Sequence, residues 1–78
     1  KRMKPFVRIY DIYGKEHVIR RDSVTHIYQT GEWKKDCCGI DGKRNYLNDE
    51  TYGTYVCGHG YSIPVQPDIM AAIKFLKL

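Results

Sequence analysis

Residues 51–78, TYGTYVCGHGYSIPVQPDIMAAIKFLKL, constrain the fold more than any other part of the chain. Residues 52–57 are rich in aromatic and β-branched side chains, which favour a strand. Gly58-His59-Gly60 is a turn signal, and residues 61–66 then alternate between apolar and polar, as in a returning strand. Pro64 has no N–H for a ladder, so it places this second strand at the edge of a sheet or ends it there.

A short helix is expected after Pro67. Proline suits the first turn of a helix, and Asp68 lies where a carboxylate favours the positive end of the helix dipole. Apolar residues then recur at i, i+3, i+4 and i+7, which places them on one helix face: Ile69, Ala72, Ile73 and Leu76. A helix of about ten residues is not stable alone in water, so we expect it to dock on the strands.

The upstream half predicts three more strands. Residues 6–13 (FVRIYDIY) are dense in β-branched and aromatic residues, Gly14-Lys15 makes a turn, and residues 16–20 return to complete a hairpin. Residues 24–30 favour a third strand, although their start also fits a helical turn. The sequence therefore predicts one mainly-β domain over residues 1–78. It is a β-meander of four to five antiparallel strands, curled as a sheet or small SH3-like barrel, with one C-terminal α-helix across an open end.

Residues 31–50 are the exception, because they show neither helical nor strand periodicity. Their glycines, aspartates and asparagines are turn formers, and a segment of this length in so small a domain is typical of a functional or mobile loop. Asp41-Gly42 predicts a short hairpin turn within it. Trp33, the only Trp in the chain, is surrounded by turn formers and is the residue that core packing explains least.

The chain is close to the lower size limit for a stable single core. It has 78 residues, of which 42% are hydrophobic and 28% charged, a composition typical of a folded protein. Chains of this size are usually supported by a metal, by disulfides or by an oligomer interface. We expect a homo-oligomer.

The positive charge is concentrated near the N-terminus. The net charge is +4. Residues 1–21 contain only two acidic residues, Asp11 and Glu16, against these basic ones: Lys1, Arg2, Lys4, Arg8, Lys15, Arg20 and Arg21. Such a patch can attract an anionic partner, such as a nucleic acid, a nucleotide or an acidic protein surface, or it can simply be a solvated polar face.

A basic and aromatic surface is the main candidate site. The hairpin and the long loop contribute its predicted partner-binding residues: Trp33, Lys34, Lys35, Lys43, Arg44, Tyr46, Arg8, Lys15, Arg20 and Arg21. Trp, Tyr and Arg dominate protein hot spots, so we predict a small non-catalytic module that binds a protein partner as a regulatory accessory or inhibitor. The alternative is a nucleic-acid or nucleotide binder, in which bases stack on aromatic rings beside a basic track.

Other aromatic and histidine side chains are expected to be structural. Core packing is the simpler role for Tyr10, Tyr28, Tyr55 and Tyr61. For His17 and His26 we expect a strand position with a backbone hydrogen-bond partner.

The cysteines suggest a further alternative, a zinc-stapled binding module. Cys37, Cys38, Cys57 and His59 have the side chains of a Cys3His site. The adjacent Cys37 and Cys38 do not follow the usual C-x2-C spacing, so we predict neither a resident metal nor another cofactor.

The sequence favours no catalytic role. A cysteine nucleophile needs a base within hydrogen-bond reach and usually a third orienting group, and no local motif supplies them.

Residues 5–12 contain Arg8 and Asp11, so they do not form the apolar region of a signal peptide. With no apolar run long enough for a membrane span, we expect a soluble cytoplasmic protein with reduced thiols.

Three segments, IYGKEHVI, DSVTHI and YSIPV, occur in that order before the apolar helix. They give a hairpin with a glycine turn, a short apolar element, a second hairpin and a C-terminal helix. This layout, over residues 12–76, resembles that of small FlbD-type bacterial flagellar and swarming accessory proteins. The basic N-terminal strand, the twenty-residue insert and the cysteine content depart from it. The resemblance implies a non-enzymatic accessory or regulatory role and assigns no functional residue.

Overall fold

The computed structural model describes residues 4–33, 38–43, 51–66 and 68–78, with backbone alone at residues 32, 33, 51 and 52. In these ranges the elements are β1 (Phe6–Tyr10), β2 (Glu16–Arg20), the 3-10 turn η1 (Arg21–Ser23), β3 (Val24–Trp33), β4 (Thr51–Gly58), β5 (Tyr61–Val65) and α1 (Ile69–Leu76). The predicted class, mainly β with one C-terminal helix, is confirmed.

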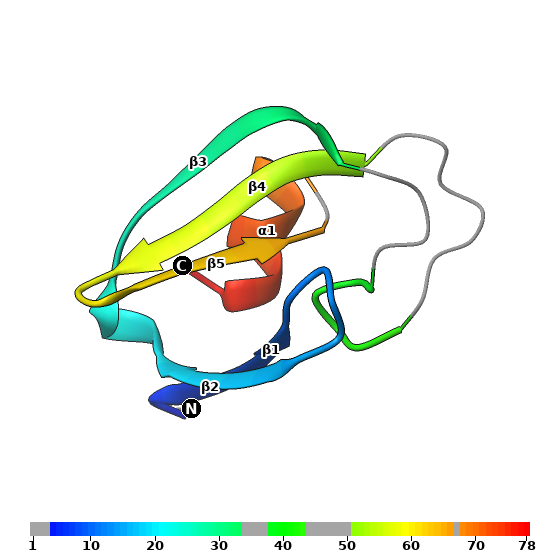
Figure 1. Cartoon of the computed structure of the whole chain (residues 1–78). Coiled ribbons are helices and arrows are strands. Elements are labelled where there is room, and N and C mark those ends of the chain that lie inside the picture. The colour runs from blue at the N-terminus through cyan, green and yellow to red at the C-terminus, as the bar shows by residue number, and fades with distance from the viewer. Residues whose placement is uncertain (1–3, 34–37, 44–50, 67) are drawn as a thin grey trace.

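The strands form two antiparallel sheets (Figure 1). One is the hairpin β1–β2, and the other has the order β3–β4–β5, with α1 behind it in the figure. Among the described residues the sheets do not join into a closed barrel, because residues 38–43 lie between β1 and β5. Ile40 accepts a hydrogen bond from the Tyr10 N–H (3.0 Å) and donates one to the Gln66 carbonyl (2.8 Å).

The β1–β2 connection begins earlier than the sequence predicts. β1 ends at Tyr10, and Asp11 starts the turn because its carboxylate accepts hydrogen bonds from the N–H groups of Tyr13 and Lys15, both at 2.9 Å. Gly14 has φ +88°, a conformation that favours glycine. The predicted turn at Gly14-Lys15 is confirmed, whereas residues 11–13 belong to the connection rather than to the strand.

The predicted hairpin of β4 and β5 is present. His59 and Gly60 form its turn, and β5 is an edge of the three-stranded sheet, as Pro64 requires. The Pro64 carbonyl accepts a hydrogen bond from the Ile12 N–H at 3.1 Å. The edge of β5 is therefore covered by residues from the β1–β2 connection and by residues 38–43.

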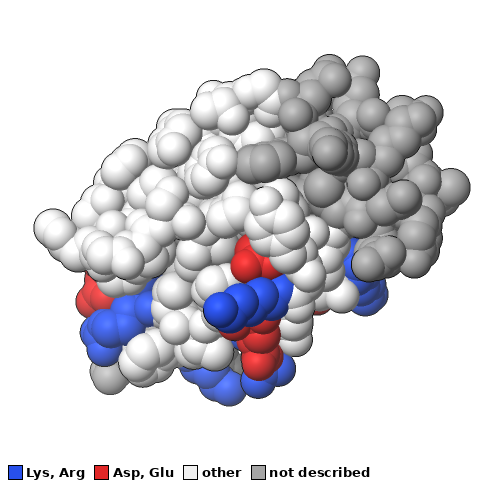
Figure 2. All heavy atoms as spheres, viewed as in Figure 1, with Lys and Arg blue, Asp and Glu red and all other residues white. Residues whose placement is uncertain are grey.

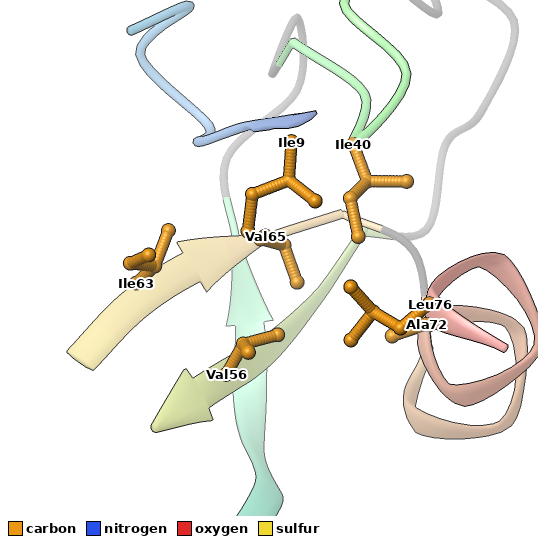
Figure 3. Close-up of a cluster of buried hydrophobic side chains, with 7 residues drawn as sticks. All are labelled: Ile9, Ile40, Val56, Ile63, Val65, Ala72 and Leu76. Atoms are coloured by element: carbon orange, nitrogen blue, oxygen red, sulfur yellow. The ribbon is translucent and has the colours of Figure 1, made fainter. Parts of the chain in front are cut away.

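The core lies between the two sheets and α1. Its buried side chains converge from β1, residues 38–43, β4, β5 and α1 (Figure 3), and they are Ile9, Ile40, Val56, Ile63, Val65, Ala72 and Leu76. Burial of a Val, Leu or Ile side chain contributes about 1.5–3 kcal/mol. The core is thus assembled from five separate segments of the chain.

The helix docks as its sequence predicts, but it begins at Ile69, so Pro67 precedes its first turn rather than belonging to it. The Asp68 carboxylate caps it by accepting from the Ala71 N–H at 3.1 Å. Ala72 and Leu76 are fully buried, while Ile69 and Ile73 are half-buried. The predicted apolar face is therefore the face that docks.

The described part of the long loop is ordered by a turn. Strand β3 extends through Trp33, so residues 31–33 are strand. At Asp41-Gly42 the predicted turn is confirmed: Gly42 has φ +87°, and the Lys43 N–H donates to the Asp41 side chain at 3.0 Å. Ile40 is in the core. The prediction of a functional or mobile loop also rests on residues 34–37 and 44–50, which lie outside the described residues.

Candidate binding surface

Aromatic rings stack on the face of the three-stranded sheet that is turned away from α1. Tyr28 on β3 lies opposite Tyr55 on β4, with ring centroids 5.1 Å apart and an interplanar angle of 16°. His26 stacks on Tyr28 at 5.9 Å, also at 16°. Pro64, opposite Tyr55 on β5, continues the row. We call these four residues the aromatic face.

Strand alternation explains why these side chains point outward. Val56 and Ile63, the neighbours of Tyr55 and Pro64, are buried in the core, so the alternate residues lie on the opposite side of the sheet. Tyr28 is 42% exposed and Tyr55 is half-buried. The signal for this face in the sequence is the alternation along β4 and β5, where Tyr55 and Pro64 each neighbour a residue that is buried.

The four tyrosines that the sequence predicts in the core lie in different environments. For Tyr28 the expectation is wrong, because its ring is exposed on the outer face, and Tyr55 lies on that face as well. Tyr61 packs against the core, and its hydroxyl bonds the Ser23 hydroxyl at 2.8 Å. Tyr10 is half-buried, and its hydroxyl donates to Glu16 at 3.3 Å. Tyrosine suits both faces of a sheet, which is why residue type alone did not separate them.

The aromatic face carries little charge. The segments β3, β4 and β5 contain no Lys or Arg. In Figure 2 the described surface over these strands is white, and the charged atoms in view lie mostly below it, over β1 and β2. Within the three strands, this face therefore presents rings and backbone without Lys or Arg side chains.

The free edge of the sheet belongs to β3. Among the described residues, no backbone hydrogen bond reaches β3 from the side opposite β4. Because Pro64 has no N–H and its carbonyl bonds the β1–β2 connection, its backbone faces away from β4. Its partner Tyr55 therefore faces β3, where it bonds Tyr28. Ile27 and Gln29, on either side of Tyr28, consequently direct their N–H and C=O groups out of the sheet.

An open groove runs beside the same edge. It has a volume of about 250 Å³ and lies between the first half of β3 and the end of α1, and it is lined by Val24, Thr25, His26, Ile27, Ile73 and Leu78. Its lining is mainly apolar. The groove and the outward-facing backbone groups thus lie at one side of the molecule.

The three described arginines of the predicted surface are engaged within the chain. Arg8 pairs with Glu16 at 2.8 Å. Arg20 donates to Asp22 at 2.9 and 3.1 Å, which lowers the pKa of the Asp22 carboxyl and raises the pKa of Arg20. The Arg20 guanidinium also lies 5.5 Å from the centre of the Phe6 ring.

Arg21 has a structural position. Its guanidinium donates to the carbonyls of Leu76 (2.8 Å), Phe6 (3.3 Å) and Lys4, and so ties η1 to both ends of the chain. Lys15 and Lys43 are exposed.

The loop half of the predicted surface is not placed. Lys34, Lys35, Arg44 and Tyr46 lie outside the described residues, and Trp33 is described only by its backbone, which pairs with Thr51. The predicted surface of basic and aromatic residues therefore stays a prediction.

A buried carboxylate organises the basic hairpin. Asp11 is 6% exposed, and it accepts a hydrogen bond from His17 Nε2 at 2.9 Å in addition to the two backbone bonds of the turn. Burial acts to raise the pKa of Asp11, but the hydrogen bonds from His17, Lys15 and Tyr13 outweigh it and leave the pKa below its ordinary value. His17 thus has a carboxylate partner, where a backbone partner was expected. The ring of His26 bonds the Thr25 hydroxyl at 3.0 Å instead.

Three of the four candidates for a zinc site lie among the described residues. Cys57 is buried, with its sulfur 3.5 Å from the Ser62 hydroxyl, and His59 is exposed at the adjacent turn. The sulfur of Cys38 lies 3.6 Å from the Gly39 carbonyl. Cys37 lies outside the described residues. In the part of the chain that is described, no three His, Cys, Asp or Glu side chains are grouped to hold a metal, so the zinc alternative stays a prediction.

Comparisons of the chain with protein-family models, with curated proteins and with solved structures find no match. The helix within the described residues is too short to cross a membrane. The proposed function therefore rests on the geometry of the surface.

Proposed function

We propose that the chain is a small non-catalytic module that binds a protein partner through the aromatic face, as an accessory or inhibitor. The observation that supports this most is the exposed stack of Tyr28 on Tyr55, held on regular strands and free of neighbouring Lys and Arg within the sheet. Tyrosine is enriched at the centres of protein interfaces and among their hot spots.

The physical advantage of this face is that it is already ordered. Tyr28 and Tyr55 are fixed by paired strands, and they stack on each other before a partner arrives. Binding then loses little side-chain entropy, which otherwise costs roughly 0.5–1.5 kcal/mol for each immobilised side chain. The low charge of the face fits a partner surface that is mainly apolar and uncharged.

Nucleic-acid or nucleotide binding is the alternative, because stacked rings also suit bases. It needs a basic track beside the rings to bind the phosphates. Among the described arginines, Arg8 and Arg20 are paired with acidic residues and Arg21 bonds carbonyls. These contacts favour the protein partner.

Capture of a partner by immobilised variants tests the proposal. We expect Tyr28→Ala and Tyr55→Ala each to reduce the amount of captured partner at least about tenfold, a loss of about 1.4 kcal/mol. Phe6→Ala is the matched control, because Phe6 is an exposed ring on the other sheet. Trp33→Ala, assayed in parallel, tests the contribution of the loop.

The nature of the captured molecule decides between the two functions. A protein bound to the uncharged face should be retained after nuclease treatment and at high salt, whereas nucleic-acid binding falls steeply with salt concentration. Equal recovery of the same protein by wild type, Tyr28→Ala and Tyr55→Ala would contradict the aromatic face as the binding site. Recovery of nucleic acid that is lost at high salt would favour the alternative.

A further inference from the structure

The free edge of β3 has a regular centre between two irregular positions. The register of β3 against β4 shifts on both sides of residues 26–30 and is undisturbed within them. Tyr28 is the middle residue of this regular segment, and its neighbours Ile27 and Gln29 direct their backbone groups outward. A strand added to this edge can therefore form the most regular backbone hydrogen bonds around Tyr28.

We propose that this edge pairs with the same edge of a second copy of the chain, antiparallel about a two-fold axis at Tyr28. In this register Tyr28 lies opposite Tyr28 of the second copy, and Ile27 lies opposite Gln29 of the second copy. The regular segment then pairs over its full length with itself. An axis at any other residue leaves part of the segment opposite an irregular position.

The hydrogen-bond pattern fits this axis. Ile27 and Gln29 face outward, so each of the two Ile27–Gln29 pairs exchanges two N–H···O=C bonds across the interface. Tyr28 falls in a pair without such bonds, where the Cα atoms of opposite residues are about 4.5 Å apart. The ring stack of Tyr55 and Tyr28 is thereby brought beside the stack of the second copy. The two three-stranded sheets become one sheet of six strands.

Nothing in the sequence of β3 opposes this pairing. Exposed edge strands commonly carry Lys or Pro, which prevent association, and β3 contains neither. Although each chain has a net charge of +4, the described basic residues lie outside the three-stranded sheet. The two β3 strands therefore bring no Lys or Arg of their own into the shared ladder.

The helix adds apolar surface at the same axis. Gln29 accepts a hydrogen bond from the Ile69 N–H at 3.0 Å, which holds the first turn of α1 close to the centre of β3. Met70, in that turn, is 68% exposed. The two-fold axis brings the first turns of both helices near each other on the inner side of the sheet. The proposed interface thus covers apolar side chains as well as backbone groups.

Sedimentation velocity over a wide concentration range tests the association. Gln29→Pro removes the outward N–H, whereas Gln29→Ala keeps it, and both lose the side-chain bond to Ile69. We expect wild type and Gln29→Ala to shift from monomer to dimer as concentration rises. Gln29→Pro should need at least about tenfold more protein for the same dimer fraction. A wild-type chain that stays monomeric at every concentration, or two variants that associate equally, would overturn the proposal.

Disulfide trapping tests the register. In a chain with Cys37→Ser, Cys38→Ser and Cys57→Ala, Tyr28→Cys places two thiols directly opposite each other, at a Cα separation compatible with a disulfide. We expect mild oxidation to convert Tyr28→Cys into a covalent dimer. His26→Cys and Thr30→Cys should cross-link poorly alone and efficiently when mixed, because position 26 faces position 30 of the second copy. Equal cross-linking of all three single variants, or preferential mixing of positions 26 and 28, would overturn the register.

This inference and the proposed function share Tyr28 but can be tested apart, because the pairing rests on the backbone groups of Ile27 and Gln29 and the capture of a partner rests on the rings. Tyr55→Ala alters the face and should leave the sedimentation behaviour of the wild type unchanged. Loss of partner capture with an intact dimer, or the reverse, therefore identifies which of the two proposals fails.

Discussion

The two edges of the three-stranded sheet differ, because the β5 edge is covered by other residues and the β3 edge is open among the described residues. At β5, Pro64 has no N–H to donate, and its carbonyl accepts a hydrogen bond from the Ile12 N–H. Residues 38–43 cover the same strand and contribute Ile40 to the core. At β3, the backbone of Ile27 and Gln29 faces outward beside an open apolar groove. The covered edge belongs to the part of the molecule that holds the fold together. The open edge and the aromatic face beside it are left uncovered by the other described residues.

The largest effect is expected where the covered edge meets the core. Ile40→Ala should lower the free energy of unfolding by about 2–5 kcal/mol, because it leaves a cavity among side chains from both sheets. Urea denaturation measures this loss. Val18→Ala is the control, since Val18 is 60% exposed and should change stability by no more than about 0.5 kcal/mol. An equally small effect at Ile40 would mean that residues 38–43 do not close the core.

The turn that supports the covered edge should make stability depend on pH. Because the folded pKa of Asp11 lies below its ordinary value of 3.8, the ionised carboxylate stabilises the fold above that value. This contribution is lost as the pH falls through the folded pKa. Asp11→Asn should lower the free energy of unfolding near neutral pH by about 1–3 kcal/mol.

Stability curves of the two proteins across acidic pH provide the measurement. The wild type should lose stability on acidification, and the difference from Asp11→Asn should shrink as the pH falls below 3.8. A difference that stays constant at every pH would show that the charge of Asp11 does not contribute.

Proline substitutions compare the two sides of β3 directly. Tyr28→Pro removes a bond to β4 and should cost about 1–3 kcal/mol more than Tyr28→Ala. Gln29→Pro removes an N–H that has no partner among the described residues, so its stability should stay close to that of Gln29→Ala. Denaturation at low protein concentration keeps association out of the comparison. A larger loss of stability from Gln29→Pro than from Tyr28→Pro would mean that the Gln29 N–H, and not the Tyr28 N–H, bonds β4.

The smallest effect is expected on the basic hairpin. The pair of Arg8 and Glu16 is exposed on both sides, and exposed pairs contribute about 0–1 kcal/mol. Arg8→Ala should therefore change both the midpoint of urea denaturation and the capture of a protein partner only slightly. A strong loss of capture would move the binding site from the aromatic face to the hairpin.

The local elements were predictable because their signals are local. Alternation around Pro64 identified β5 as an edge strand, and Asp68 with the apolar spacing of Ala72 and Leu76 identified the helix and its docked face. Asp41-Gly42 identified the turn in the long loop. In each case one short stretch of sequence is enough to define the geometry.

The parts that were missed depend on distant contacts. Ile40 is a single apolar residue among turn formers, and only its contacts with β1, β5 and α1 make it part of the core. Tyr28 and Tyr55 were assigned to the core because tyrosine suits either face of a strand. The interposed residues 38–43, which keep the sheets apart, bond to Tyr10 and Gln66 and have no periodic signal of their own.

Amide hydrogen exchange along β3, followed by NMR at low and high protein concentration, tests the open edge most directly. We predict that the Tyr28 amide is protected at both concentrations, because it bonds β4. The amides of Ile27 and Gln29 should exchange rapidly in the dilute protein and become protected as the concentration rises. Protection of all three amides in the dilute monomer, or rapid exchange of Ile27 and Gln29 at every concentration, would contradict an open edge that pairs with itself.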